Sequence, residues 1–253
     1  MSQEVGQAGA LNLAPLTLTG NVLASPLAQA VPVSSSANIF VGERVTVDTG
    51  ANEEVVQVTA IPSLNVIQGI LQQNHAAASP VVAQGAFPQG ILTTAPGNQL
   101  QLFGDINADG TLAYVEYDCN PGTANAPGTL TRSLTVLAPG VVTQNQPQIL
   151  LNNLLANPNN APCFTPSMGA GGAVAPNNCS VGGNAYTCVT DVQVMLTVQT
   201  AERDPQTEGF VTMTKSFLNL SSRNVFAAWF NATSANPVPN LLQPNPPGLP
   251  LQP

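Results

Sequence analysis

The sequence predicts a mainly β protein of the α+β class, with the end of a helix at its start, a body of antiparallel sheets and an extended tail. Apolar residues alternate with polar ones in many short segments, helix-favouring residues open the chain, and prolines crowd its last part. Alternation with a period of two is typical of half-buried strands. We therefore divide the chain into 1–14 (end of a helix), 15–235 (β-rich body) and 236–253 (Pro-rich tail).

The clearest strand is 189–200, which places four aliphatic residues on one face: Val192, Val194, Leu196 and Val198. The Asp204-Pro205 pair then marks a turn. Residues 209–219 return with Val211, Met213 and Phe217 on one face. The two segments predict a long antiparallel hairpin.

A second hairpin is predicted over 39–61, where two alternating runs flank a turn at 49–52. It belongs to a small β subdomain that we expect over 37–85. Further strands are expected near 64–71, 80–85 and 98–103, and 111–118 and 129–137 are expected to form another pair. The leucines of 148–156 recur at helical spacing and predict a short helix, and Gly9 is expected to end the helix at the start of the chain. Residues 157–185 are rich in Gly, Pro and Asn and predict a loop.

Composition excludes some classes of partner. Hydrophobic residues form 43% of the 253 residues, enough for a substantial core, whereas charged residues form only 7% and the net charge is −8. The basic residues are few and scattered: Arg44, Arg132, Arg203, Lys215 and Arg223. Nucleic-acid binding needs clustered Lys and Arg, and anionic membrane surfaces attract such clusters, so neither partner is expected.

The four cysteines, Cys119, Cys163, Cys179 and Cys188, lack the close pairing that a zinc site requires. Two disulfides are the better interpretation, and they indicate an oxidising compartment. Cys179 and Cys188 flank a short Gly/Asn loop, which favours a local bridge and leaves Cys119 for Cys163. Four cysteines allow three pairings, so this one is a prediction.

One motif points to a metal. Residues 105–116 match the calcium-loop pattern, with Asp105, Asn107, Asp109, Thr111 and Glu116 as the candidate Ca²⁺ ligands. Strands are predicted on both sides, however, instead of the two helices of an EF-hand. An extended chain would carry Glu116 roughly 16 Å beyond Thr111, out of reach of the ion. The same residues could equally form a turn in which Asp and Asn accept hydrogen bonds from their own backbone.

Catalytic constellations are lacking in the sequence, and we expect no enzymatic activity. His75 is the only histidine and has no nucleophile signature near it, which favours a packing or turn role. Glu116 and Asp118 would share one strand face, where a solvated pair is a simpler interpretation than a catalytic one.

An ordered set of short segments resembles PilW-type minor pilins, the prepilin-like proteins of type IV pilus and type II secretion machinery. The resemblance runs through nearly the whole chain. Its segments are 3–9, 41–43, 47–51, 74–77, 103–110, 115–119, 150–153, 162–164, 196–200, 204–207 and 223–225.

This resemblance implies a pilin-type head, without the apolar N-terminal helix, that acts by contact with other pilin or pseudopilin subunits. The precursor would be anchored in the inner membrane of a bacterial cell envelope by that helix alone, with the head periplasmic or displayed on a filament. It also implies a structural pair of cysteines, in agreement with Cys119–Cys163, and no catalytic residue. Two alternatives stay open: a secreted, calcium-stabilised binding module or adhesin, and a β-protein of a phage or virion.

Overall fold

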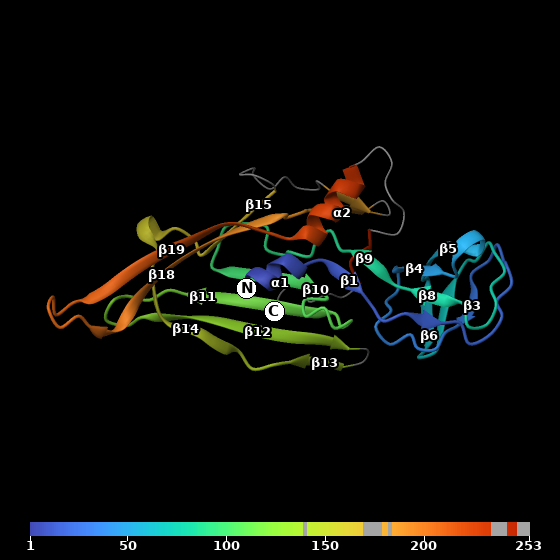
Figure 1. Cartoon of the computed structure of the whole chain (residues 1–253), viewed down its shortest axis with the longest axis horizontal. Helices are drawn as coiled ribbons and strands as arrows, with labels where there is room; N and C mark the ends of the chain where they lie inside the picture. The colour runs from blue at the N-terminus through green and yellow to red at the C-terminus, as the bar shows by residue number, and fades with distance from the viewer. Residues whose placement is uncertain (139–140, 169–178, 182–183, 234–241, 247–253) are drawn as a thin grey trace.

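Strands dominate the computed structural model, which describes residues 1–138, 141–168, 179–181, 184–233 and 242–246. They form a larger and a smaller lobe side by side along the longest axis of the molecule (Figure 1). All pairings between the named strands are antiparallel.

The larger lobe is built on an eight-stranded sheet with the order β10-β11-β12-β14-β18-β15, in which β13 pairs with β12 and β19 pairs with β18. Its strands are β10 (Gln99–Gly104), β11 (Ala113–Asn120), β12 (Gly128–Ala138), β13 (Val141–Gln144), β14 (Gln148–Leu155), β15 (Phe164–Ser167), β18 (Asp191–Arg203) and β19 (Phe210–Ser221). A separate small hairpin joins β16 (Cys179–Val181) to β17 (Asn184–Tyr186). The short 3-10 helix η2 (Pro158–Asn160) follows β14.

The smaller lobe contains two sheets, β2-β8-β4-β5 and β3-β7-β6. Its strands are β2 (Leu16–Thr17), β3 (Gln29–Pro32), β4 (Arg44–Val47), β5 (Glu54–Gln57), β6 (Ala60–Ser63), β7 (Val66–Gly69) and β8 (Pro80–Val82). A 3-10 helix, η1 (Gly50–Asn52), forms the turn between β4 and β5. Val45 lies opposite Val56 in that hairpin, and both are buried.

Strand alternation buries rows of aliphatic side chains in two main cores, and Phe103 of β10 packs into the core of the smaller lobe. In the smaller lobe, valines of β4, β5 and β8 meet Ile67 and Leu71. In the larger lobe, Leu100, Leu102 and Val115 pack with Val192 and Val194 of β18.

The lobes are joined through the pair of β1 (Ala10–Asn12) and β9 (Gln84–Ala86). Just before β1 the chain crosses close to Gly90. A Cβ atom on Gly90 would lie 2.1 Å from the backbone nitrogen of Gly9, so only glycine fits there. Gly9 itself has a φ of +79°, a conformation that favours glycine.

The predicted α+β class with a pilin-type N-terminal helix is wrong, because the described chain is nearly all β. At the start of the chain only α1 (Ser2–Gln7) is helical, which is less than two turns. The second helix, α2 (Arg223–Thr233), directly follows β19 and was not expected.

The helix predicted at 148–156 is also wrong, since β14 occupies this segment. Other elements are confirmed: the hairpin of β18 and β19, the hairpin of β4 and β5, and the antiparallel pair of β11 and β12. Most of the Pro-rich tail lies outside the described residues. Within 242–246, Leu242 bridges Ala86 in parallel, and the Gln243 side chain bonds to the backbone of Arg44 and Gln84.

Candidate interaction surface

The hairpin of β18 and β19 extends from one end of the larger lobe as a long arm (Figure 1). We call residues 195–217 the arm. Among the described residues, β19 pairs with β18 alone, so its other edge carries no strand. Both faces of β19 are exposed from Val211 to Ser216. The hairpin was predicted from its alternation, but its exposure was not.

One face of β19 carries three apolar side chains that are about half exposed: Val211 (50%), Met213 (55%) and Phe217 (51%). We call them the apolar row. Met213 lies opposite Val198 of β18, and Phe217 lies opposite Val194. Directly opposed residues share a sheet face, so the row continues the core-facing side of β18 beyond the part that the lobe covers. An uncovered apolar row of this kind is typical of a contact surface.

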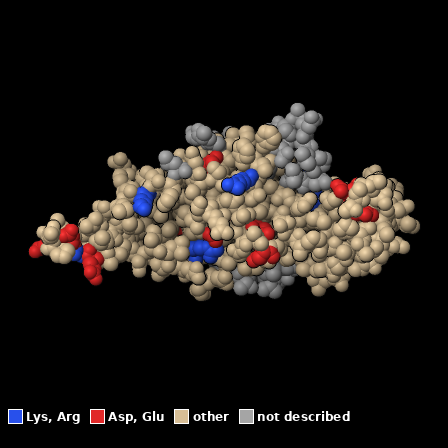
Figure 2. Space-filling view, in the orientation of Figure 1, with Lys and Arg blue, Asp and Glu red and all other residues tan. Residues whose placement is uncertain are grey.

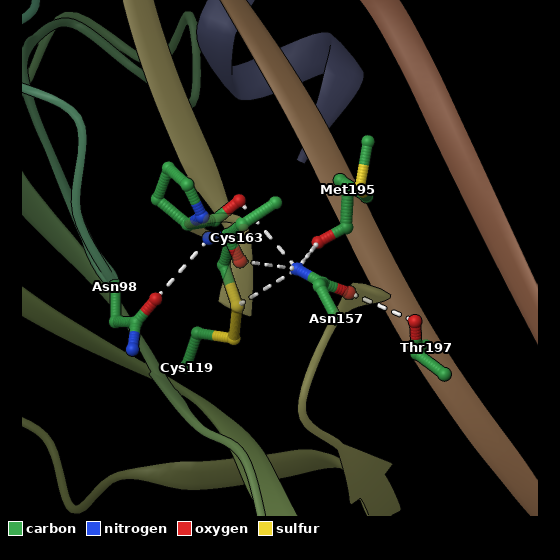
Figure 3. Close-up of a disulfide and its surroundings, with 8 residues drawn as sticks. Asn98, Cys119, Asn157, Cys163, Met195 and Thr197 are labelled. Carbon is green, nitrogen blue, oxygen red and sulfur yellow. Dashed lines mark hydrogen bonds between the residues drawn. A yellow bond between two sulfur atoms is a disulfide. The ribbon is translucent and has the colours of Figure 1, made fainter. Parts of the chain in front are cut away.

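The base of the arm is held by the Cys119–Cys163 disulfide, as predicted, and by the buried side chain of Asn157 (Figure 3). The amide nitrogen of Asn157 donates to the Met195 carbonyl at 2.8 Å, and its oxygen accepts from the Thr197 hydroxyl at 2.9 Å. Asn157 thereby links the disulfide region to β18. Cys188 is also disulfide-bonded, whereas the side chain of Cys179, its predicted partner, lies outside the described residues.

Sequence reasoning missed Asn157, because nothing local marks it. It follows β14 in a stretch rich in asparagine, and its partners lie 38 and 40 residues further along the chain.

A charged cluster fastens α1 to the larger sheet. The Glu4 carboxylate accepts hydrogen bonds from the Arg132 guanidinium on β12 and the Tyr117 hydroxyl on β11. Burial alone would raise the pKa of Glu4, but the bonds from Arg132 and Tyr117 outweigh it and hold this pKa below its ordinary value. Glu4 is therefore a charged anchor for the start of the chain.

The candidate calcium loop lies between β10 and β11. Asp105 is almost fully buried, and its carboxylate accepts from the backbone N–H groups of Asp109 at 3.0 Å and Gly110 at 3.1 Å. The Asp109 carboxylate accepts from the N–H of Thr111 at 2.9 Å. These bonds build the turn of the alternative interpretation. Asn107 is exposed in the same turn.

Glu116 lies away from this turn, in β11. Its carboxylate accepts from the Tyr114 hydroxyl at 2.6 Å and the Gln101 amide at 3.1 Å, and Glu116 is paired with Gln101 across the sheet. In the described part of the chain, no group of three or more His, Cys, Asp or Glu side chains is arranged to hold a metal ion.

His75 is buried in the smaller lobe between two carboxylates. Its Nδ1 atom lies 3.1 Å from Asp48 Oδ2, and its Nε2 atom lies 2.6 Å from Glu54 Oε1. The bond from His75 is the main cause that lowers the pKa of Asp48. Glu54 also accepts from the backbone N–H groups of Gln72 and Gln73. The cluster therefore ties together three segments of the lobe, in keeping with the packing role expected for His75.

Glu43 is a buried carboxyl, and one backbone N–H donates a hydrogen bond to it. It is 0% exposed, its Oε2 atom accepts from the Phe40 N–H at 3.1 Å, and its Oε1 atom has no hydrogen-bond partner among the described residues. Burial raises the pKa of Glu43 to about 8. Nothing in the sequence around Glu43 distinguishes it from a surface residue.

Comparisons with protein-family models, curated proteins and solved structures found no match to this chain. Among the described residues, no helix combines the length and apolar character that a membrane span requires.

Proposed function

We propose that this protein is a structural subunit that acts through protein–protein contacts, as the head of a minor pilin or pseudopilin in a type IV pilus-like filament. The apolar row on β19 supports a contact function, because three large apolar side chains lie exposed along an edge that pairs with no other strand in the described part of the chain. The ordered resemblance to PilW-type proteins supports the filament. The partners of this protein are then other pilin or pseudopilin subunits in a bacterial cell envelope.

Three polar clusters resemble reactive sites most closely, and their side chains bind other parts of the same chain. This use of polar side chains supports the proposed structural role. Asp105 holds its own turn, His75 joins Asp48 to Glu54, and Glu4 anchors α1. Each is a use of polar groups to build a scaffold, which is what a subunit that works by contact requires.

Replacing the apolar row tests this function in cells. We expect the triple variant Val211→Ser, Met213→Ser and Phe217→Ser to enter sheared surface filaments at least tenfold less than wild type, measured by immunoblot. The matched control replaces exposed leucines of the smaller lobe, Leu23→Ser and Leu64→Ser, and should enter filaments normally. Normal entry of the triple variant, at wild-type cellular levels, would overturn the proposal.

The second candidate function is a secreted, calcium-stabilised binding module, and the buried carboxylate of Asp105 is the observation that favours it. Replacing Asp105 with Asn should lower the free energy of unfolding by about 1–3 kcal/mol, because a buried carboxylate acceptor for two N–H groups is lost. Denaturant unfolding in chelator measures this loss. The matched control is Asn107→Ser in the same turn.

Calcium then separates the two candidate functions. If the loop is only a turn, millimolar Ca²⁺ leaves the unfolding of the wild type unchanged, and calorimetry records no heat of binding. A calcium-stabilised module requires the wild type to gain stability with Ca²⁺, and the Asp105→Asn variant to gain much less.

A further inference from the structure

The free edge of β19 has the properties of a strand that pairs with another chain. It is 12 residues long and is bonded to β18 on one side only within the described residues. An exposed edge presents unpaired N–H and C=O groups that another strand can satisfy. Proteins usually protect such edges with charged or proline residues, and from Phe210 to Ser221 there is only one of either kind, Lys215.

The charges along the arm favour a partner strand that runs in the opposite direction. The tip of the arm carries Glu202 at the end of β18, and Asp204 and Glu208 in the turn that follows. Figure 2 shows acidic atoms gathered at this end of the molecule. Arg203, the last residue of β18, lies at the same tip, with its guanidinium over the Phe210 ring. The tip therefore has a net negative charge.

The charge beyond the other end of β19 differs from that of the tip. Arg223, at the start of α2, is exposed, whereas Asp191 is buried and accepts from the hydroxyls of Thr190 and Ser221. The other cation of the strand, Lys215, lies in the middle of β19. Two copies of β19 in antiparallel orientation would bring each acidic end toward a basic end, whereas parallel copies would bring like charges together. In a chain with so few charges, this complementarity identifies a second copy as a fitting partner.

The side chains also select a register. When Thr214 of one copy lies opposite Thr214 of the other, Val211 of each copy lies opposite Phe217 of the other copy. Lys215 of each copy then lies opposite Met213 of the other. Moving the centre of the pairing to Lys215 would place two like charges face to face, and moving it to Met213 would place Phe217 opposite Gly209. Cross-strand apolar pairs stabilise a sheet and opposed like charges destabilise it, so the first register is preferred.

We propose that two copies of this protein pair through β19 in antiparallel orientation, with Thr214 opposite Thr214, to form one sheet that continues across both molecules. The inference rests on the proposed contact function in that it names the partner of the same surface. It requires neither a filament nor a particular compartment.

Sedimentation velocity on the purified 253-residue chain tests the association. The wild type should form dimers at micromolar concentration, and Phe217→Asp should weaken self-association at least tenfold, because two carboxylates would then enter the apolar pairs. Leu64→Asp, on an exposed leucine of the smaller lobe, is the control and should dimerise normally. Far-ultraviolet circular dichroism and melting confirm that each variant is folded.

Cross-linking tests the register without disturbing the apolar row. Thr214→Cys should give a covalent dimer with a short bifunctional maleimide. Thr212→Cys alone should not, whereas Thr212→Cys mixed with Ser216→Cys should, since these two positions oppose one another. A monomeric wild type at 100 μM, or a dimer that cross-links only in another register, would overturn the inference.

The two proposals can fail separately. If the triple Ser variant is excluded from filaments although the wild-type head is a monomer, the pairing is overturned and the contact function stands. If the head dimerises as described but the triple variant enters filaments normally, the filament function is overturned and the pairing stands.

Discussion

Replacing Glu43 with Gln is expected to raise the free energy of unfolding at pH 8 by about 2–4 kcal/mol. The pKa of Glu43 rises from 4.5 to about 8 in the folded state because the carboxyl is fully buried. The folded protein therefore binds this proton more tightly than the unfolded chain does. Each unit of such a difference corresponds to about 1.4 kcal/mol, and relaxation around the buried group reduces the total.

The sign of this effect fixes the pH range of the experiment. The contribution of protonated Glu43 to stability is complete below pH 4.5 and is lost as the pH rises toward 8, because the unfolded chain releases the proton first. Guanidinium unfolding of the wild type from pH 5 to 9 should thus show stability falling with pH, and Glu43→Gln should remove most of this slope.

A second glutamate of the same lobe provides the control for Glu43. Glu53 is an exposed glutamate of the same lobe, and Glu53→Gln should leave the slope unchanged. A wild-type stability that is constant from pH 5 to 8, or an equal slope in wild type and Glu43→Gln, would contradict the assignment of the slope to Glu43.

Removing the Cys119–Cys163 disulfide is expected to cost about 3–4 kcal/mol of unfolding free energy. The bond joins residues 44 apart in sequence, and closing a loop of that length restricts the unfolded chain by about this amount. Denaturant unfolding of the Cys119→Ala, Cys163→Ala double variant measures the loss.

The single variant Cys163→Ala shows whether the bond or the packing is responsible. It breaks the same bond and keeps the Cys119 side chain, so it should lose nearly as much stability as the double variant. If the two single replacements instead add up to the loss of the double variant, the side-chain volumes and not the cross-link stabilise the fold.

Local patterns were sufficient to predict the two hairpins. The alternation in 189–200 and 209–219 indicated β18 and β19, and the paired valines around residues 49–52 indicated β4 and β5. In each case both halves of the contact are close in sequence, so the turn and the alternation together define it.

The predictions of helices failed where a local pattern had two interpretations. The leucines of 148–156 fit a helix by their spacing, but β14 pairs with β12 and with β18, and these long-range pairings determine the structure. Irregular register between β12 and β14 also disturbs the simple alternation that would have indicated a strand. At the start of the chain, helix-favouring residues gave only the six residues of α1.

The candidate surface was predictable in part. The apolar row was correctly placed on one face of a strand, but only the sheet order shows that β19 is an edge strand among the described strands. The buried Glu43, and the bonds of Glu4 to residues more than 110 positions away, depend on tertiary packing that no local pattern encodes.

The junction between the lobes has a consequence for how such a protein can change over evolutionary time. The chain enters the smaller lobe through β1 and leaves it through β9, and these strands are direct antiparallel neighbours, with Ala10 opposite Ala86. Paired backbones are about 5 Å apart, which is a gap that a tight turn can close. The smaller lobe is thus an insertion with adjacent ends, and a lineage could lengthen it, exchange it or delete it while the eight-stranded sheet keeps its strand order.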